Sequence, residues 1–255
     1  MENIAVKSIC TKKGWGTKEV IFVVRRGGAG LVSSANQRRK MLKPIRWNTF
    51  IRDFFVIQIG FALYGISIAL TIQANLGAST WSVFEVALAN ITGLTIGTIT
   101  ILVAFVVLIF ALFLKEKVGW GTLGNILSIG LWLDLFLFLI PSVKENLIFQ
   151  SLMLLAGIFI QGIASAVYIG VDAGAGPRDS LMLAIHRVTK LSLRMARASV
   201  ELMIFTIGWL LGGPAGIGTL IFAVLIGPAV QWAFKVFKVK PHKEEKLVEN
   251  NVVVK

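Results

Sequence analysis

"GVDAGAGPRDSLMLAIHRV", residues 170–188, interrupts a chain that is otherwise dominated by apolar side chains. The stretch holds three glycines, two aspartates, two arginines and a histidine, and long apolar runs lie on both sides of it. Glycines permit a sharp turn, and Pro177 directly after Gly176 fits the first position of a helix. The stretch therefore predicts a break in the chain, followed by a short helix over residues 177–189.

The composition predicts a polytopic membrane protein. Of 255 residues, 56% are hydrophobic and 15% are charged, which is more apolar side chain than a single soluble core can hide. Six runs approach the ~20 residues that a spanning helix needs. They are residues 53–72, 98–114, 121–140, 147–171, 198–212 and 217–234. We therefore expect an all-α bundle of six transmembrane helices.

The chain also contains an internal repeat. When it is shifted by 97 residues, 60–130 align with 157–227 without a gap and six glycine pairs coincide. These pairs are Gly60/Gly157, Gly65/Gly162, Gly77/Gly174, Gly119/Gly216, Gly121/Gly218 and Gly130/Gly227. Each copy has one span, a glycine-led break, a short helix and two more spans. The short helices, about 79–92 and 177–189, reach only ~20 Å and cannot cross a ~30 Å hydrocarbon layer.

Three spans per repeat predict that the second copy is inverted in the membrane. The charge distribution agrees, because Lys and Arg accumulate in cytoplasmic loops. The first break, residues 73–97, has no Lys or Arg, whereas its counterpart and the three residues after it, 170–197, have five: Arg178, Arg187, Lys190, Arg194 and Arg197. We interpret most of this charge as topogenic. Both termini are then cytoplasmic.

Four segments follow from these patterns. Residues 1–45 are expected to form a basic, disordered cytoplasmic leader, and 46–142 the first transmembrane repeat. Residues 143–238 form the second repeat and 239–255 a charged cytoplasmic tail. An alternative is that translation begins at Met41, where a short basic start leads into the first span.

Several stretches resemble the YczE family of bacterial membrane proteins, which is similar to the YitT-type membrane proteins. They are "ANLGASTWSVFEVALANITGLTIGT" (74–98), the opening stretch with its continuation to residue 201, and "LLGGPAGIGTLIFAVLIGPAVQ" (210–231). The resemblance covers roughly residues 45–235. It implies a multi-pass protein of the cytoplasmic membrane and supplies no catalytic or ligand residues. Arg194 stands where the first copy has Gly97, which puts a tight turn there in doubt.

Inverted repeats with broken segments are typical of secondary transporters, whose sites form where the interruptions meet. Helix N-termini at these breaks suit an anionic or carbonyl-bearing ligand. We therefore expect a substrate site at the two breaks and their short helices. Its candidates are Asn75, Gly77, Ser79, Glu85, Asp172, Gly174, Gly176 and Asp179. The alternative is that these residues only satisfy freed backbone groups of the loops.

Two further features involve polar or small residues within spans. Arg197 lies four residues before Glu201, so the two are a candidate ion pair, either a plain interfacial salt bridge or a gating pair. Asp134 and Gln231 are repeat equivalents, and we expect polar contacts between helices from both. Glycines spaced by four residues permit close helix approach or a homodimer. They are Gly93/Gly97, Gly208/Gly212 and Gly212/Gly216.

The sequence disfavours several classes of function. It has no Walker, zincin or nucleophile-elbow motif, so an enzyme is not expected. Cys10 is the only cysteine and there are two histidines, which predicts neither a metal site nor a cofactor. The net charge of +13 lies in the gaps between apolar runs, which indicates the lipid bilayer and not nucleic acid as partner. A small-solute permease or exporter is the leading hypothesis. The alternative is a scaffold or regulatory protein that recruits a cytoplasmic partner through its basic loop and tail.

Overall fold

The computed structural model describes residues 5–12, 18–26, 29–36, 49–114, 119–171, 173–174 and 176–239. The chain divides into two units, Met1–Met41 and Leu42–Lys255. In the first, three antiparallel strands form a sheet in the order β1 (Ala5–Lys12), β2 (Lys18–Arg26), β3 (Ala29–Asn36). A disordered leader was expected here. The β-branched and aromatic run at the centre of β2, "VIFVV", favours a strand, which the count of basic residues did not reveal.

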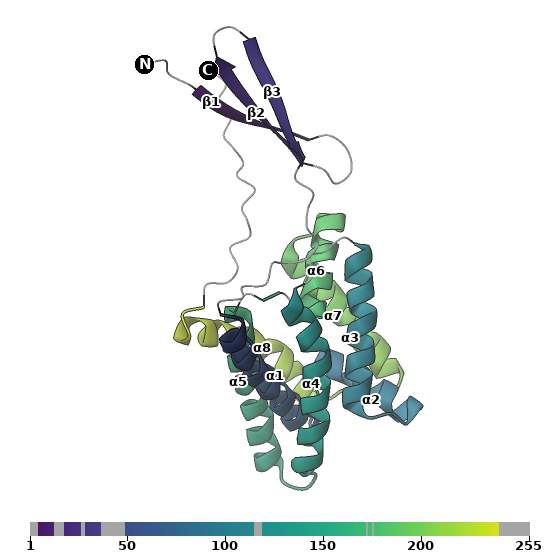
Figure 1. The fold of residues 1–255 in the computed structure, drawn as a ribbon. Helices are drawn as coiled ribbons and strands as arrows, with labels where there is room; N and C mark the ends of the chain where they lie inside the picture. The colour runs from purple at the N-terminus through teal and green to yellow at the C-terminus, as the bar shows by residue number, and fades with distance from the viewer. Residues whose placement is uncertain are drawn as a thin grey trace. The chain divides into compact units, whose positions relative to one another are not determined.

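The described part of the second unit is all α-helical, with eight helices (Figure 1). They are α1 (Phe50–Gln73), α2 (Thr80–Thr92), α3 (Ile96–Phe113), α4 (Trp120–Leu139), α5 (Leu147–Gly170), α6 (Pro177–Thr189), α7 (Leu193–Leu210) and α8 (Ile217–Val236). The predicted tail lies outside the described residues, except for Val239.

The duplication extends to every helix boundary. A shift of 97 residues carries α1 onto α5, α2 onto α6, α3 onto α7 and α4 onto α8, and all starts and ends coincide. The caps correspond as well. Thr122 and Thr219 each accept a hydrogen bond from the backbone N–H of the glycine that precedes α4 or α8. The turn that Arg194 put in doubt does form, because Lys190 takes the same left-handed conformation as Gly93, with φ of 60° and 73°.

The two repeats pack crosswise. Gly60 of α1 lies against Tyr168 of α5, and Gly157 of α5 lies against Thr71 of α1. Thr71 and Tyr168 are themselves repeat equivalents, so α1 and α5 are antiparallel and related by an approximate two-fold axis. The same exchange joins α2 to α7 and α3 to α6. In Figure 1, α6 lies toward one end of the helical unit and α2 toward the other.

The two breaks are also exchanged between the repeats. The carbonyl of Leu76 accepts a hydrogen bond from the N–H of Gly218 at 2.7 Å, and the carbonyl of Ala173 accepts one from Gly121 at 3.2 Å. Each break therefore rests on the start of a helix from the other repeat. Gly77 shows why no side chain fits there: its φ is +114°, and a Cβ would lie 2.8 Å from the backbone nitrogen of Gly216.

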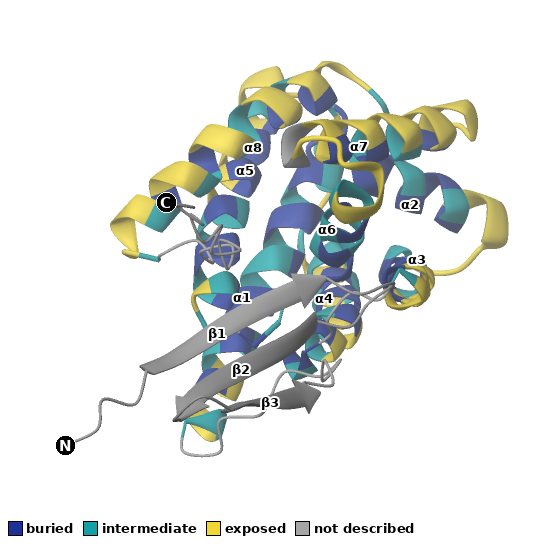
Figure 2. Ribbon diagram, turned by 90° about the horizontal axis from the view of Figure 1, so that it is seen from above, coloured by how far each residue is buried: buried dark blue, intermediate teal, exposed yellow. Residues whose placement is uncertain are grey.

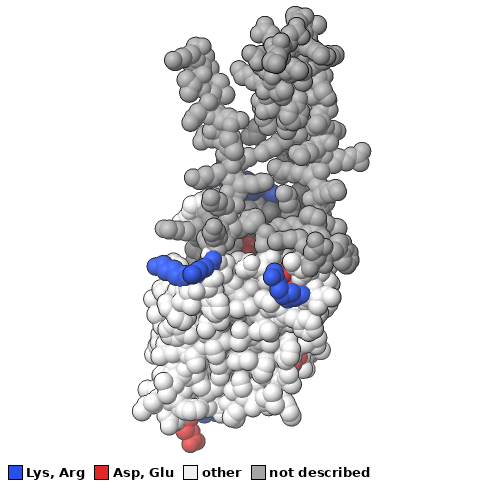
Figure 3. Space-filling view, turned by 60° about the vertical axis from the view of Figure 1, so that its left-hand side comes forward, with Lys and Arg blue, Asp and Glu red and all other residues white. Residues whose placement is uncertain are grey.

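Five of the described helices are long and apolar enough to cross a membrane: α1, α3, α4, α5 and α8. Six spans were predicted. The remaining one, α7, has the length of α3, but Arg194, Arg197 and Glu201 make it too polar to qualify by composition. The outer faces of the helices are exposed (Figure 2), with Phe113 and Phe138 each 87% exposed. One such face shows few charged side chains among its described residues (Figure 3). Such a surface fits hydrocarbon better than water.

Candidate functional site

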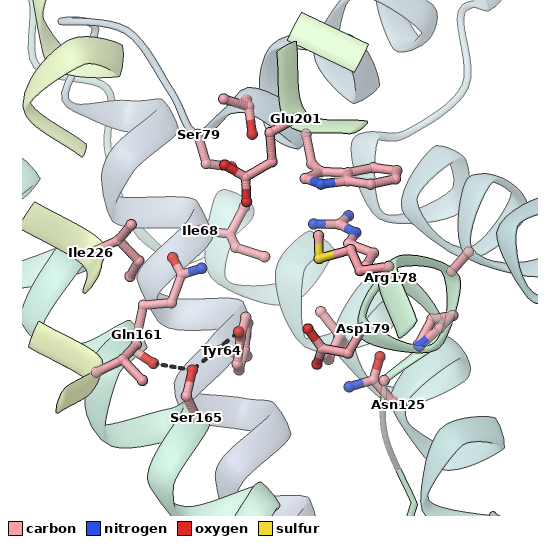
Figure 4. A pocket seen from close by; sticks show the side chains of 18 of the residues that line it. Tyr64, Ile68, Ser79, Asn125, Gln161, Ser165, Arg178, Asp179, Glu201 and Ile226 are labelled. Carbon is pink, nitrogen blue, oxygen red and sulfur yellow. Dashed lines mark hydrogen bonds between the residues drawn. The ribbon is translucent and has the colours of Figure 1, made fainter. Parts of the chain in front are cut away.

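A cavity of about 170 Å³ lies between the repeats, and all eight helices contribute to its lining (Figure 4). Much of the lining consists of repeat equivalents. These pairs include Tyr64/Gln161, Ile68/Ser165, Trp81/Arg178, Thr100/Arg197, Ala104/Glu201 and Ile129/Ile226. A cavity lined by both members of so many pairs lies on the approximate two-fold axis. The chemistry of the pairs differs, so the cavity is symmetric in shape and asymmetric in charge.

Arg178 stands at the centre of this arrangement. Its guanidinium lies 4.5 Å from the centre of the Trp81 ring, within the range of a cation–π contact. It also donates to Oε1 of Glu85, whose side chain is fully buried. Thr100 completes the group by donating its hydroxyl to Oε2 of Glu85 at 3.1 Å. Most of the charge in this stretch was interpreted as topogenic, but Arg178 also has a partner inside the protein, and a buried carboxylate is costly without one.

Polar groups from α1, α5 and α6 form another part of the wall. The Tyr168 hydroxyl donates to Oδ2 of Asp179 at 2.8 Å. The hydroxyls of Tyr64 and Ser165 are 3.2 Å apart. Gln161, one turn before Ser165, accepts a hydrogen bond from Ser67 at 3.0 Å. Together these groups add hydroxyl, amide and carboxylate groups to a cavity that is also lined by Arg178, Arg197 and Glu201.

Both short helices begin at the cavity, as the sequence predicts. Ser79 precedes α2, and its hydroxyl accepts a hydrogen bond from the N–H of Ser82 at 3.2 Å. Gly176 precedes α6, and Asp179 supplies a carboxylate in its first turn. Ser79, Gly176 and Asp179 all line the cavity. Glu85 lies behind the lining and acts on it through Arg178.

The predicted pair of Arg197 and Glu201 is confirmed. Nε of Arg197 lies 2.9 Å from Oε1 of Glu201, and both residues line the cavity from α7. The pair is partly exposed, so its net contribution to stability is about 0–1 kcal/mol. Its position in the cavity lining is the more informative property.

Three other predicted site residues do not reach the cavity. Asn75 is exposed and donates to Oγ of Ser142 at 2.6 Å, so it fastens the first break to the loop between α4 and α5. Gly77 packs on the start of α8 and Gly174 on the start of α4. These residues shape the breaks, as the alternative interpretation held. Asp172 lies outside the described residues.

Sequence reasoning missed the polar residues within the spans. Gln161, Ser165 and Tyr168 recur at intervals of four and three residues on α5, which places them on one face of the helix. That spacing, in an apolar helix, was a usable signal. Tyr64 is recognisable as the repeat equivalent of Gln161. No three His, Cys, Asp or Glu side chains gather to hold a metal ion anywhere in the described chain.

The repeats differ at one side of the cavity. In the first repeat α3 packs along α4, and a Cβ on Gly130 would lie 2.5 Å from the carbonyl oxygen of Gly97. Asp134 reinforces this contact by accepting hydrogen bonds from the Thr95 hydroxyl at 2.6 Å and the Gly97 N–H at 2.7 Å. The polar helix contact predicted for Asp134 is confirmed. This side of the cavity is closed.

In the second repeat the equivalent helices, α7 and α8, do not pack along each other in the described chain. Ala223, Gly227 and Gln231 of α8 are exposed, whereas their equivalents in α4 are buried or half-buried. No described atom lies within 4 Å of a Cβ built on Gly227. The contact predicted for Gln231 is therefore absent from the described residues. The α7–α8 side of the cavity, here called the open side, lacks the helix contact that closes the α3–α4 side.

Comparison with known proteins supports the membrane assignment. Residues 51–235 match the model of a family of unknown function, DUF6198. An uncharacterized protein of Haemophilus influenzae is 32% identical over 77% of this chain and 89% of its own length. The uncharacterized membrane protein YczE of Bacillus subtilis is 32% identical over 72% of this chain and 82% of its own. No solved structure matches. The family match covers all eight helices except the first residue of α1 and the last residue of α8. The resemblance to the YczE family is therefore confirmed, and this chain belongs to the DUF6198 family.

Proposed function

We propose that this protein is a small-solute permease or exporter of the bacterial cytoplasmic membrane, built from two inverted repeats with the substrate site in the cavity between them. The antiparallel packing of α1 on α5 supports the inversion, because a two-fold axis that exchanges antiparallel helices is perpendicular to them. The location of the cavity on that axis is typical of secondary transporters.

The charge distribution supports an orientation. The turn between α6 and α7 contains Lys190, and Arg187 precedes it, whereas the equivalent turn between α2 and α3 has no basic residue. We place the first of these turns and both termini in the cytoplasm. Arg187 also has a structural role, because its guanidinium donates to the carbonyl of Leu114 at the end of α3. That contact reduces the basic surface that a recruiting scaffold would need.

The observation that carries the proposal is the difference between the repeats. The α3–α4 side is closed through Gly97 and Gly130, and the equivalent α7–α8 side is open. Two repeats with one fold can exchange conformations, so a second state follows in which α7 closes on α8 while α3 leaves α4. Alternation between these states exposes the cavity by two routes in turn, which is what transport requires.

Cysteine accessibility tests this proposal. The only native cysteine is Cys10, so Cys10→Ser gives a background without thiols. Ala104→Cys places a thiol at the cavity wall, and Ala111→Cys, two turns later on α3 and fully buried away from the cavity, is its control. A membrane-impermeant thiol reagent is applied to spheroplasts and to inside-out vesicles.

A permease that alternates predicts labelling of Ala104→Cys from both sides and of Ala111→Cys from neither. A packed scaffold predicts labelling of neither variant. Labelling of Ala104→Cys from a single side, or from none, contradicts the proposal.

A further inference from the structure

The charged side chains at the cavity leave one carboxylate without an ion pair of its own among the described residues. Arg178 is paired with Glu85, and Arg197 is paired with Glu201. Asp179 lines the cavity as well, where it accepts a hydrogen bond from the Tyr168 hydroxyl and interacts electrostatically with Arg197 without forming an ion pair with it. Two positive and three negative side chains therefore meet here, and the excess charge is negative.

The N-termini of α2 and α6 do not need an anionic ligand, because side chains of the protein already interact with them. The start of α2 is satisfied by the hydroxyl of Ser79. The start of α6 already has the carboxylate of Asp179 in its first turn, where a negative charge interacts favourably with the helix dipole. Ser79 and Asp179 therefore make the interactions at the helix N-termini for which the sequence had suggested an anionic ligand.

Part of the cavity lining is apolar. Figure 4 shows Asp179 and Asn125 on one side of the pocket, and Ile226 beside the polar Gln161 on the other. The apolar lining includes Phe222 and Ile226 of α8 and Ile68 of α1. It adjoins the open side between α7 and α8. A ligand that fits both the apolar lining and Asp179 has an apolar body and one polar head.

We propose that the cavity binds a small amphipathic organic cation, a protonated amine with an apolar body, whose ammonium group pairs with Asp179. The three carboxylates at the cavity outnumber the two guanidinium groups, and an excess negative charge inside a membrane protein is costly. A ligand ammonium provides the balancing charge and further hydrogen-bond donors. Tyr168 orients the carboxylate through its hydroxyl, and the isoleucines contact the body of the ligand. The assignment rests on the proposed permease site and adds its substrate class.

Binding measured by thermal shift tests the assignment without requiring transport. The full-length protein in detergent at neutral pH is titrated with two pairs of probes of similar shape and opposite charge: benzylammonium against benzoate, and n-butylammonium against butyrate. A ligand that binds only the folded state raises the unfolding temperature. We expect both ammonium probes to raise it and neither carboxylate to do so.

Three variants test whether ammonium binding depends on the charge of Asp179. Asp179→Asn keeps the shape of the side chain and removes its charge, so we expect at least a tenfold loss of ammonium affinity. Asp179→Glu keeps the charge and should retain more affinity than Asp179→Asn. Glu145→Gln removes an exposed carboxylate that does not line the cavity and should bind as the wild type does.

The assignment is overturned if the carboxylates bind as well as the ammonium probes, if neither ammonium probe binds, or if Asp179→Asn binds ammonium unchanged. These outcomes are distinct from failure of the proposed function. Ammonium binding that depends on Asp179, in a protein whose Ala104→Cys variant is labelled from one side only, supports the ligand class and rejects the permease.

Discussion

Trp81 and Arg178 occupy equivalent positions in the two repeats, and they touch: the guanidinium carbon of Arg178 lies 4.5 Å from the centre of the Trp81 ring. Equivalent residues can meet only near the axis that relates them. The chain thus places an aromatic ring and a cation where a symmetric dimer would have two identical side chains. Two repeats within one chain can differ in this way, and the single charge at this position pairs with Glu85.

The pair of Arg178 and Glu85 predicts an asymmetric response to mutation. Arg178→Gln leaves the fully buried Glu85 without its cation, and loss of one partner of a buried pair costs about 3–5 kcal/mol. The double variant Glu85→Gln/Arg178→Gln removes both charges and should be more stable than Arg178→Gln alone. Unfolding temperatures of the purified proteins measure this. A double variant less stable than Arg178→Gln would show that Glu85 is not held by Arg178.

The closed and open sides of the cavity predict opposite effects of one substitution at equivalent glycines. Gly130→Ala places a methyl group against the carbonyl of Gly97 and should destabilise the protein. Gly227→Ala meets no described atom within 4 Å, and alanine in a helix is more favourable than glycine by about 1 kcal/mol. It should be neutral or stabilising. Equal destabilisation by both substitutions would mean that α7 packs on α8 in solution as α3 packs on α4.

Asp134 is expected to hold the closed side shut. Asp134→Ala removes the acceptor for Thr95 and for the Gly97 N–H, so α3 should separate from α4 more often. In the background of Cys10→Ser and Ala104→Cys, the rate of thiol labelling should then rise severalfold from one side of the membrane. Gln231→Ala, at the exposed equivalent position, serves as the control and should leave the rate unchanged. A labelling rate that Asp134→Ala leaves unchanged would show that Asp134 does not hold α3 against α4.

Much of this fold could be predicted from the repeat, since glycines that coincide at one shift mark backbone positions with shared geometry. The glycine pairs Gly60/Gly157 and Gly77/Gly174 lie where helices or breaks of the two repeats touch. The inward direction of Arg178 was not predictable. An arginine in a basic loop has the same sequence signature whether it faces the cytoplasm or a buried carboxylate 93 residues earlier in the chain.

The site was predictable only in part, because some of its features have a local sequence signal and others depend on contacts between distant segments. Ser79 and Asp179 were found because helix starts have a local signature. The difference between the α3–α4 and α7–α8 sides depends on contacts between helices far apart in space. One sequence difference falls at this contact: position 194 has arginine where the first repeat has Gly97, which lies against Gly130.

The central claim, inversion of the repeats across the membrane, is tested most directly by two equivalent threonines. Thr92 and Thr189 end α2 and α6, and both are exposed. In the Cys10→Ser background, Thr92→Cys and Thr189→Cys are each treated with an impermeant thiol reagent in spheroplasts and in inside-out vesicles. We predict that Thr92→Cys reacts only in spheroplasts and Thr189→Cys only in vesicles. Reaction of both cysteines from the same side would contradict the inverted arrangement.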